Sequence, residues 1–216
     1  MTLLDGIAAE TCRAAHVLAL TTGRLVLRAP RIDDAEAVAA LLDDRRISEN
    51  LARVPFPYGR ADAEAFIAAA NQPGGEIALL ITEPDDTIVG GCGIHKRDEK
   101  HPEIGYWLGV PYWHQGYATE AVRALIDHAF GDLGYQALQA GARVSNPASR
   151  RVLEKCGFQW TGVALTRIRA IASAAPVDRF RLDRGLWASL RSWGAVKIAS
   201  STAQTPGAAV PVFCDS

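Results

Sequence analysis

A turn that could hold a phosphate group lies near the middle of the chain, where Gly116 and Ala118 flank Tyr117. Before it, residues 103–110 alternate apolar with other side chains, which predicts a strand ended by Pro111. After it, apolar side chains recur at helical spacing, which predicts a helix. The first N–H groups of a helix have no partner inside it, and small residues let an anion come close to them. We therefore expect a phosphate at this turn.

A tight strand-to-helix connection without a ligand explains Gly116 equally well on local grounds, because glycine is common in such turns. A second segment contains a helix start at Asn146 and Pro147 and a left-handed stop at Gly157, which predicts a short helix. In this helix Asn146 is explained by a simple cap, and Ser149 by a solvated polar residue in the first turn. The two segments occur in order, with a strand-like stretch between them, and this order favours a functional interpretation of both.

Together the two segments resemble the acetyl-CoA binding motifs of the GNAT N-acetyltransferases. The family pattern is Gln or Arg, two residues, Gly, any residue, then Gly or Ala. Gly116 and Ala118 fit this pattern, whereas Trp113 stands where Gln or Arg is usual. The form Trp-x-x-Gly-Tyr-Ala-Thr-Glu-Ala resembles the RimJ/RimL branch, named for enzymes that acetylate the N-termini of ribosomal proteins. The second segment is similar to the family's Asn-x-x-Ser/Ala segment that ends in Gly-Phe, with Asn146 and Ser149 at its matching positions.

The resemblance implies a GNAT fold of the α/β (α+β) class, with a mixed, mostly antiparallel sheet, one parallel strand pair and flanking helices. The periodicity of the chain agrees with that order of elements from about residue 24 to residue 193. We expect helices over residues 3–19, after Asp33 and around Phe66, and strands over residues 24–28, 76–82, 87–95, 103–110, 137–144, 158–165 and 177–187.

The chain divides into three predicted parts: a helical extension over residues 1–22, an acetyltransferase domain over residues 23–193, and a tail over residues 194–216. The tail is rich in Ala, Ser, Thr, Pro and Gly, which predicts a mobile segment. Its apolar stretch at residues 210–213 leaves open docking on the body or on a partner.

Acyl transfer to an amine requires a neutral amine, a stabilised oxyanion and a hydrogen-bond donor for the departing thiolate. The resemblance implies that Glu103, in the family's Glu-Ile pair, removes the amine proton, commonly through water. A strand-end carboxylate that faces solvent is the alternative. The family resemblance also implies that the Ser149 hydroxyl lies near the sulfur of acetyl-CoA. In other GNAT branches a tyrosine has this acid role.

The resemblance implies that acetyl-CoA, the expected cosubstrate, is held mostly by backbone groups. The strand edge at Leu108 and Val110 should pair with the pantetheine amides, and the N–H groups of the turn should hold the pyrophosphate. Asn146 could bond to a pantetheine amide, Arg150 could approach a phosphate or only solvate its helix, and Gln115 stands where a basic residue is more usual. The expected cofactor-binding residues are Leu108, Val110, His114, Gln115, Gly116, Tyr117, Ala118, Thr119, Asn146 and Arg150.

Composition excludes several other classes of protein. The 216 residues are 49% hydrophobic, enough for one substantial core, and 23 basic against 24 acidic side chains give no electrostatic basis for binding nucleic acid. The four cysteines lie far apart, so we expect no metal site and reduced thiols in a cytoplasmic protein. No basic lead-in precedes the apolar residues near the N-terminus, and no apolar run is long enough for a bilayer, so we expect neither a signal peptide nor a membrane partner.

We expect an enzyme that moves the acetyl group of acetyl-CoA to a primary amine by direct attack in a ternary complex. The acceptor would be a protein N-terminus or a small amine, and the enzyme a monomer or homodimer. The alternative is a non-catalytic module that binds an acyl-CoA as a sensor or scaffold. The expected acceptor loops, residues 45–60 and 167–178, contain basic and acidic side chains, so the sequence sets no charge preference for the acceptor.

Overall fold

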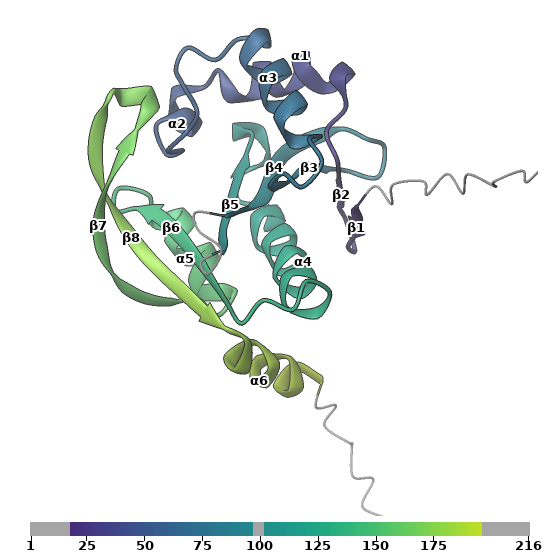
Figure 1. Cartoon of the computed structure of the whole chain (residues 1–216), viewed down its shortest axis with the longest axis vertical. Helices are drawn as coiled ribbons and strands as arrows, with labels where there is room; N and C mark the ends of the chain where they lie inside the picture. The colour runs from purple at the N-terminus through teal and green to yellow at the C-terminus, as the bar shows by residue number, and fades with distance from the viewer. Residues whose placement is uncertain (1–17, 97–101, 196–216) are drawn as a thin grey trace, which may run out of the picture.

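A computed structural model describes residues 18–96 and 102–195. At its centre is an eight-stranded sheet in the order β1-β2-β3-β4-β5-β6-β8-β7 (Figure 1). Neighbouring strands are antiparallel except β5 and β6, which run parallel, so the predicted mixed sheet with one parallel pair is confirmed. The strands are Ala19–Thr21 (β1), Val26–Arg28 (β2), Ile77–Thr82 (β3), Ile88–Lys96 (β4), Pro102–Leu108 (β5), Ala137–Arg143 (β6), Gln159–Ile168 (β7) and Ser173–Asp183 (β8).

Helices cover both faces of this sheet and bury a separate apolar cluster on each (Figure 1). The first cluster joins α4 and α5 to the sheet, with Leu125 and Phe130 of α4 fully buried. The second joins α1, α2 and α3 to the other face, with Leu80 of β3 fully buried in it. The helices are Ala35–Leu42 (α1), Arg45–Ser48 (α2), Arg60–Ala70 (α3), Tyr117–Gly131 (α4), Pro147–Lys155 (α5) and Arg184–Ala195 (α6), with 3-10 turns at Ile32–Asp34 (η1), Val110–Tyr112 (η2) and Arg169–Ile171 (η3).

The parallel pair β5–β6 is short, and this shapes the centre of the molecule. Helix α4 connects the two strands, as expected for a parallel crossover. Only Glu103 with Gln139 and Ile104 with Ala140 are paired between them. Beyond Ile104, β5 continues to Leu108 without pairing to β6, while β6 stays paired with β8 along its whole length. The strands therefore separate at their carboxyl ends, and this side of β5 has backbone groups available to another chain or ligand.

Two predicted strands were too long. The strand that starts near Glu103 ends at Leu108, and Val110 lies in η2, because Pro111 cannot continue a ladder and turns the chain. The strand predicted over residues 177–187 ends at Asp183, where α6 begins. Trp187 belongs to that helix and packs on α4 instead of on a strand neighbour.

The ends of the chain differ from the prediction where they can be compared. The predicted helix over residues 3–19 falls mostly outside the described residues, and its last residue, Ala19, begins β1. Asp33 does not cap the first helix, because η1 precedes α1 and Asp34 takes the capping position. Residues 196–216 of the predicted tail also lie outside the described residues, and the divisions at residues 22 and 193 stay predictions. Within the described ranges, none of the helices has the length and apolar character to cross a membrane.

Candidate active site

The turn before α4 presents unpaired backbone N–H groups, as the sequence predicts. Gly116 has φ +82°, a left-handed conformation that favours glycine, and the first backbone bond of the helix runs from the Glu120 N–H to the Gly116 carbonyl at 3.1 Å. The N–H groups of residues 117–119 have no acceptor among the described residues. His114 also has a positive φ, +62°, which is strained for a residue with a side chain. The backbone here has the form of an anion-binding helix N-terminus.

Several groups at this turn contact the protein, whereas the His114 and Gln115 side chains are exposed. The Tyr117 hydroxyl donates to Glu83 Oε1 at 2.7 Å, and its ring is buried. Gln115 donates through Nε2 to the Pro111 carbonyl at 3.2 Å. Ala118 packs on the first cluster, and the Thr119 carbonyl lies 3.8 Å from Cys156 Sγ. A ligand at the turn would therefore meet backbone beside the exposed His114 and Gln115 side chains.

Trp113, which departs from the family pattern, has a structural role. Its indole N–H donates to the Leu108 carbonyl at 2.9 Å. Its ring, partly buried, packs against both apolar clusters. Trp113 thus fixes the loop between β5 and α4, and it occupies one backbone acceptor at the strand end that was expected to contact pantetheine.

Arg24 brings a guanidinium group, paired with Glu120, to the turn where the sequence has Gln115 instead of a basic residue. It donates through Nη1 to the Gln115 carbonyl at 3.1 Å, pairs with Glu120 Oε2 at 2.7 Å, and lies 4.8 Å from the centre of the Tyr117 ring. The sequence analysis missed Arg24, because 91 residues separate it from Gln115 and no local pattern links them.

A cavity lies beside this turn, not at the separation of β5 and β6. Its volume is about 890 Å³. It contacts Gly116 and Thr119 but no residue of β5, so we regard it as a neighbour of the turn rather than as the reaction centre. Its charged lining residues are Arg24, Glu120, Arg123, Asp127, Asp132 and Lys155, besides His128.

At the start of α5, Asn146 and Ser149 form a cap that joins a tyrosine of β5. The Asn146 Oδ1 accepts a hydrogen bond from the Ser149 N–H at 3.0 Å, which confirms the predicted cap. The Ser149 hydroxyl lies 2.9 Å from the Tyr106 hydroxyl, and either group can donate. Burial raises the pKa of Tyr106, so its phenol stays protonated at neutral pH. Tyr106 was missed by the sequence analysis, although its strand and side were predicted.

Glu103 is largely enclosed, with only 17% of its side chain exposed. Its Oε1 lies 3.4 Å from Arg179 Nη1 on β8, and Arg179 Nη2 donates to the Thr166 hydroxyl at 2.7 Å. Its cross-strand partner on the neighbouring strand β4 is His95. These surroundings do not fit the alternative of a strand-end carboxylate that simply faces solvent.

His95 belongs to a polar row that leads away from Glu103. Its Nδ1 lies 2.8 Å from Glu76 Oε2, and the same oxygen accepts from Arg53 Nη1 at 2.9 Å. Burial, and then the positive charge of Arg53, lower the pKa of His95, which makes the imidazole neutral at pH 7. Arg53, Glu76, His95 and Glu103 therefore follow one another on one side of the sheet.

Strand alternation places Glu103 and Tyr106, the partner of Ser149, on opposite faces of β5. Glu103 lies toward Arg179, whereas Tyr106 packs against the first cluster and reaches α5. Both lie close to the point where β5 separates from β6. A substrate carbonyl at that point would have a carboxylate on one side and the Tyr106–Ser149 hydroxyl pair on the other.

Arg150 and Cys156 have structural surroundings that explain them without a ligand. Arg150 bonds through Nε to Glu154 at 2.9 Å and lies 3.4 Å from Asp178, so its charge is already compensated on the protein surface. Burial raises the pKa of Cys156 to about 11, which leaves it a protonated core thiol. No cluster of metal-ligating side chains occurs in the part of the chain that the structure describes.

Comparison with known proteins gives the family. The model of the acetyltransferase (GNAT) domain matches residues 24–159, more than half of the chain. This chain belongs to the GNAT acetyltransferase family. That family assignment agrees with the turn before α4, the cap of α5 and the single parallel strand pair.

Individual GNAT proteins are similar to most of this chain. The uncharacterized N-acetyltransferase p20 of Bacillus licheniformis is 29% identical over 151 residues, which cover 67% of this chain and 84% of p20. A provisionally assigned ribosomal-protein-serine acetyltransferase from Vibrio cholerae has 26% identity and a TM-score of 0.65, and the match covers 77% of this chain and 97% of that one. It agrees with the RimJ/RimL-like branch. The microcin C7 self-immunity acetyltransferase MccE shares the fold, with a TM-score of 0.66 at 24% identity over 75% of this chain and 93% of MccE.

Proposed function

We propose that this protein transfers the acetyl group of acetyl-CoA to a primary amine, by direct attack in a ternary complex. The acceptor would be a protein N-terminus or a small amine. The main support is the separation of β5 from β6, with Glu103 on one face and the Tyr106–Ser149 pair on the other. The neighbour MccE, described as a complex with acetyl-CoA and AMP, is further support.

The free N–H groups at the start of α4 fit the cosubstrate. Acetyl-CoA would supply an acetyl group activated as a thioester. The N–H groups of residues 117–119 would hold the pyrophosphate, because they have no other acceptor among the described residues and lie at the positive end of a helix. The side of β5 that β6 leaves unpaired, between Ile104 and Leu108, would bond to the pantetheine amides.

Glu103 would accept the proton that the amine must lose. A protonated amine has no lone pair for attack, so a base within reach raises the rate when the operating pH is below the amine pKa. Arg179, 3.4 Å away, offsets part of the carboxylate charge. The new bond joins the amine nitrogen to the acetyl carbon, the carbon–sulfur bond breaks, and the amine proton passes to Glu103 directly or through water.

The Tyr106–Ser149 pair would protonate the sulfur that leaves. The Tyr106 hydroxyl can donate either to the Ser149 carbonyl at 3.0 Å or to Ser149 Oγ at 2.9 Å, and in the second case the serine proton is free to point away from it. Because the buried phenol is protonated beforehand, it can replace that proton as the serine gives it to the thiolate, and the tyrosine would then regain a proton from water. A protein that only bound an acyl-CoA would need the helix N-terminus but neither this pair nor an enclosed Glu103.

The experiment is to measure thiol release from acetyl-CoA against a panel of amines, for the native protein and for Glu103→Gln. We expect the substitution to keep the affinity for acetyl-CoA and to lower turnover by roughly 10²- to 10⁴-fold. The loss should shrink as pH rises, because more of the amine arrives neutral. An unchanged rate near neutral pH would return Glu103 to a structural role, and binding of acetyl-CoA without thiol release for any amine would favour the sensor or scaffold.

A further inference from the structure

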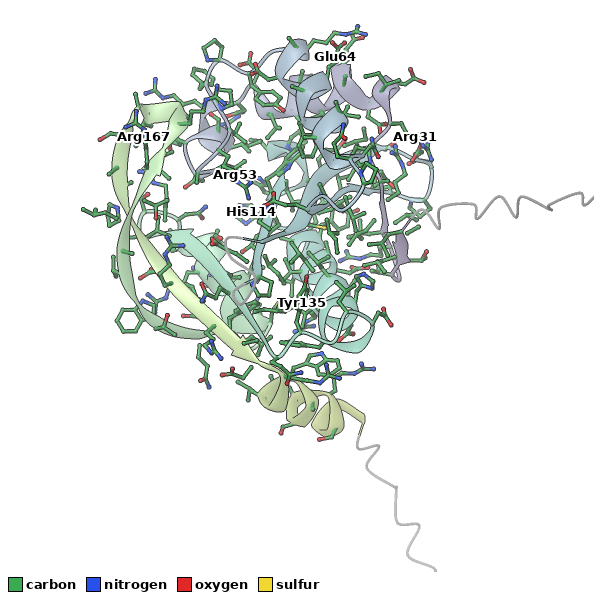
Figure 2. All side chains as sticks on the ribbon, viewed as in Figure 1. Arg31, Arg53, Glu64, His114, Tyr135 and Arg167 are labelled. Atoms are coloured by element: carbon green, nitrogen blue, oxygen red, sulfur yellow. The ribbon has the colours of Figure 1, made fainter. Side chains whose placement is uncertain are left out.

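Three arginines line a second cavity, on the face of the sheet where Glu103 lies. The cavity has a volume of about 380 Å³, and its lining residues are Ala52, Arg53, Arg167 and Arg169. Arg53 follows α2, whereas Arg167 and Arg169 come from the end of β7 and from η3. The Arg169 N–H donates to the Ala52 carbonyl at 3.1 Å and ties the two segments together. Figure 2 labels Arg53 beside the loop after α2 and Arg167 near the tip of the β7–β8 hairpin.

The folded protein separates charges that are mixed in the sequence of these loops. Asp44 is bonded to Arg46 at 2.6 Å, and Asp43 accepts from the Tyr58 N–H at 2.9 Å, so both act within their own segment. No carboxylate lines the cavity. Across residues 18–96 and 102–195, Arg167 and Arg169 take part in no ion pair and their guanidinium groups have no hydrogen bond. The cavity therefore has an excess of positive charge.

The polar row connects this cavity to the proposed base. Arg53 Nη1 donates to Glu76 at 2.9 Å, and Glu76 bonds to His95 at 2.8 Å. His95 is the cross-strand partner of Glu103, and side chains of such partners lie roughly 5 Å apart at their Cβ atoms. An acceptor whose amine reaches Glu103 would thus extend along the row, with the rest of its chain near the three arginines.

We propose that this cavity binds an oxyanion, a carboxylate or a phosphate, carried by the amine acceptor. The inference rests on the proposed function and specifies its substrate class: an amine with an acidic group a short distance away, not a polyamine. Guanidinium groups bind carboxylate and phosphate through paired hydrogen bonds, and two of the three here have no other partner among the described residues. A polycationic acceptor would be repelled by the same charges.

Acetylation kinetics with matched peptides test the proposal. The peptides share a free N-terminal amine and carry Asp, phosphoserine, Ser or Lys at the third position, since an extended chain advances roughly 3.3 Å per residue. We expect kcat/KM to be highest for the two anionic peptides and lowest for the Lys peptide. The larger of the two anionic preferences identifies carboxylate or phosphate as the natural group. Equal kcat/KM for all four would overturn the proposal.

The double variant Arg167→Gln with Arg169→Gln should lose that preference. We expect KM for the anionic peptides to rise roughly 10-fold, with kcat kept and the Ser peptide unchanged within about twofold. The matched control is Arg191→Gln, which removes an exposed arginine from α6, at the other end of the molecule (Figure 1), and should change nothing. Equal losses on the anionic and Ser peptides would show that the two arginines only support the fold of the hairpin.

A binding experiment separates this proposal from the proposed function. Peptides with an acetylated N-terminus cannot react, so calorimetry with them measures the cavity alone. We expect saturable binding of the anionic peptides that weakens as salt rises and is roughly 10-fold weaker in the double variant. Anion-dependent binding without thiol release for any amine would overturn the proposed acetyltransferase function and support the anion site. Thiol release without anion-dependent binding would support the acetyltransferase function and overturn the anion site.

Discussion

Replacing Gly116 by alanine should separate cofactor binding from folding, and Gly134→Ala provides the matched control. Both glycines have positive φ, +82° and +70°. A Cβ at Gly116 would meet only Arg24 Nη2 at 3.5 Å, an ordinary contact, and a Cβ at Gly134 would meet nothing within 4 Å. Neither substitution creates a clash, so the cost of each is that of an L-residue in the left-handed region, about 1–2 kcal/mol. For a domain of this size we expect Tm to fall by about 2 to 8 °C in both variants.

Affinity for acetyl-CoA should distinguish the two variants, because only Gly116 lies beside the free N–H groups of residues 117–119. A methyl group there would displace the pyrophosphate from at least one charge-assisted hydrogen bond, so we expect the dissociation constant to rise about 10-fold or more. Gly134→Ala should bind like the native protein. Thermal melts and titration calorimetry on both variants measure the two effects. Equal affinities in two variants of equal stability would refute the phosphate site at this turn.

Two further substitutions test the fold and the leaving-group chemistry. Burial raises the pKa of Asp34, but hydrogen bonds from Arg28 and from the Arg31 N–H lower this pKa by more, so the net shift is downward. The ionised carboxylate therefore stabilises the fold above pH 4, and this stabilisation is lost as the pH falls below about 4. Asp34→Asn should lower the free energy of unfolding by about 3 kcal/mol at pH 7 and by much less at pH 3; equal losses in urea titrations at the two pH values would contradict this. Tyr106→Phe should lower turnover by about 10²-fold without weakening acetyl-CoA binding, and adding Ser149→Ala should cost little more, because the two hydroxyls act as one unit. Additive losses in single-turnover rates would mean that they act separately.

The parts of the site that the sequence predicts are those with local causes. The left-handed stop at Gly157, the cap at Asn146 and the proline that follows it act through bonds within a few residues, and each is found where expected. The alternation of residues 103–110 likewise predicts a strand that begins near Glu103, although the observed strand ends two residues earlier, at Leu108. These features depend on backbone geometry and hydrogen bonds that short segments largely set themselves.

The parts that were missed depend on contacts between distant segments. Arg24 reaches the turn from 91 residues away, and the Tyr106 hydroxyl meets Ser149 across 43 residues. The first turn of α6 was mistaken for strand because Trp187 also suits a strand. Its helical conformation is decided by packing of Trp187 on Phe130 and by a hydrogen bond to Asp127. Sequence periodicity carries no information about which distant partner a side chain will find.

Because Trp113 packs against both apolar clusters while its indole N–H binds the end of β5, the loop before α4 is shared by two cores. Local opening of either cluster would release this loop, so we expect the elements on the two faces of the sheet to exchange their amide hydrogens as one cooperative unit. A ligand that orders the loop would slow exchange on both faces at once. Core substitutions far from the turn, in α3 or in α5, would then appear as changes in ligand affinity, and screens for stabilising mutations would select tighter binders among them.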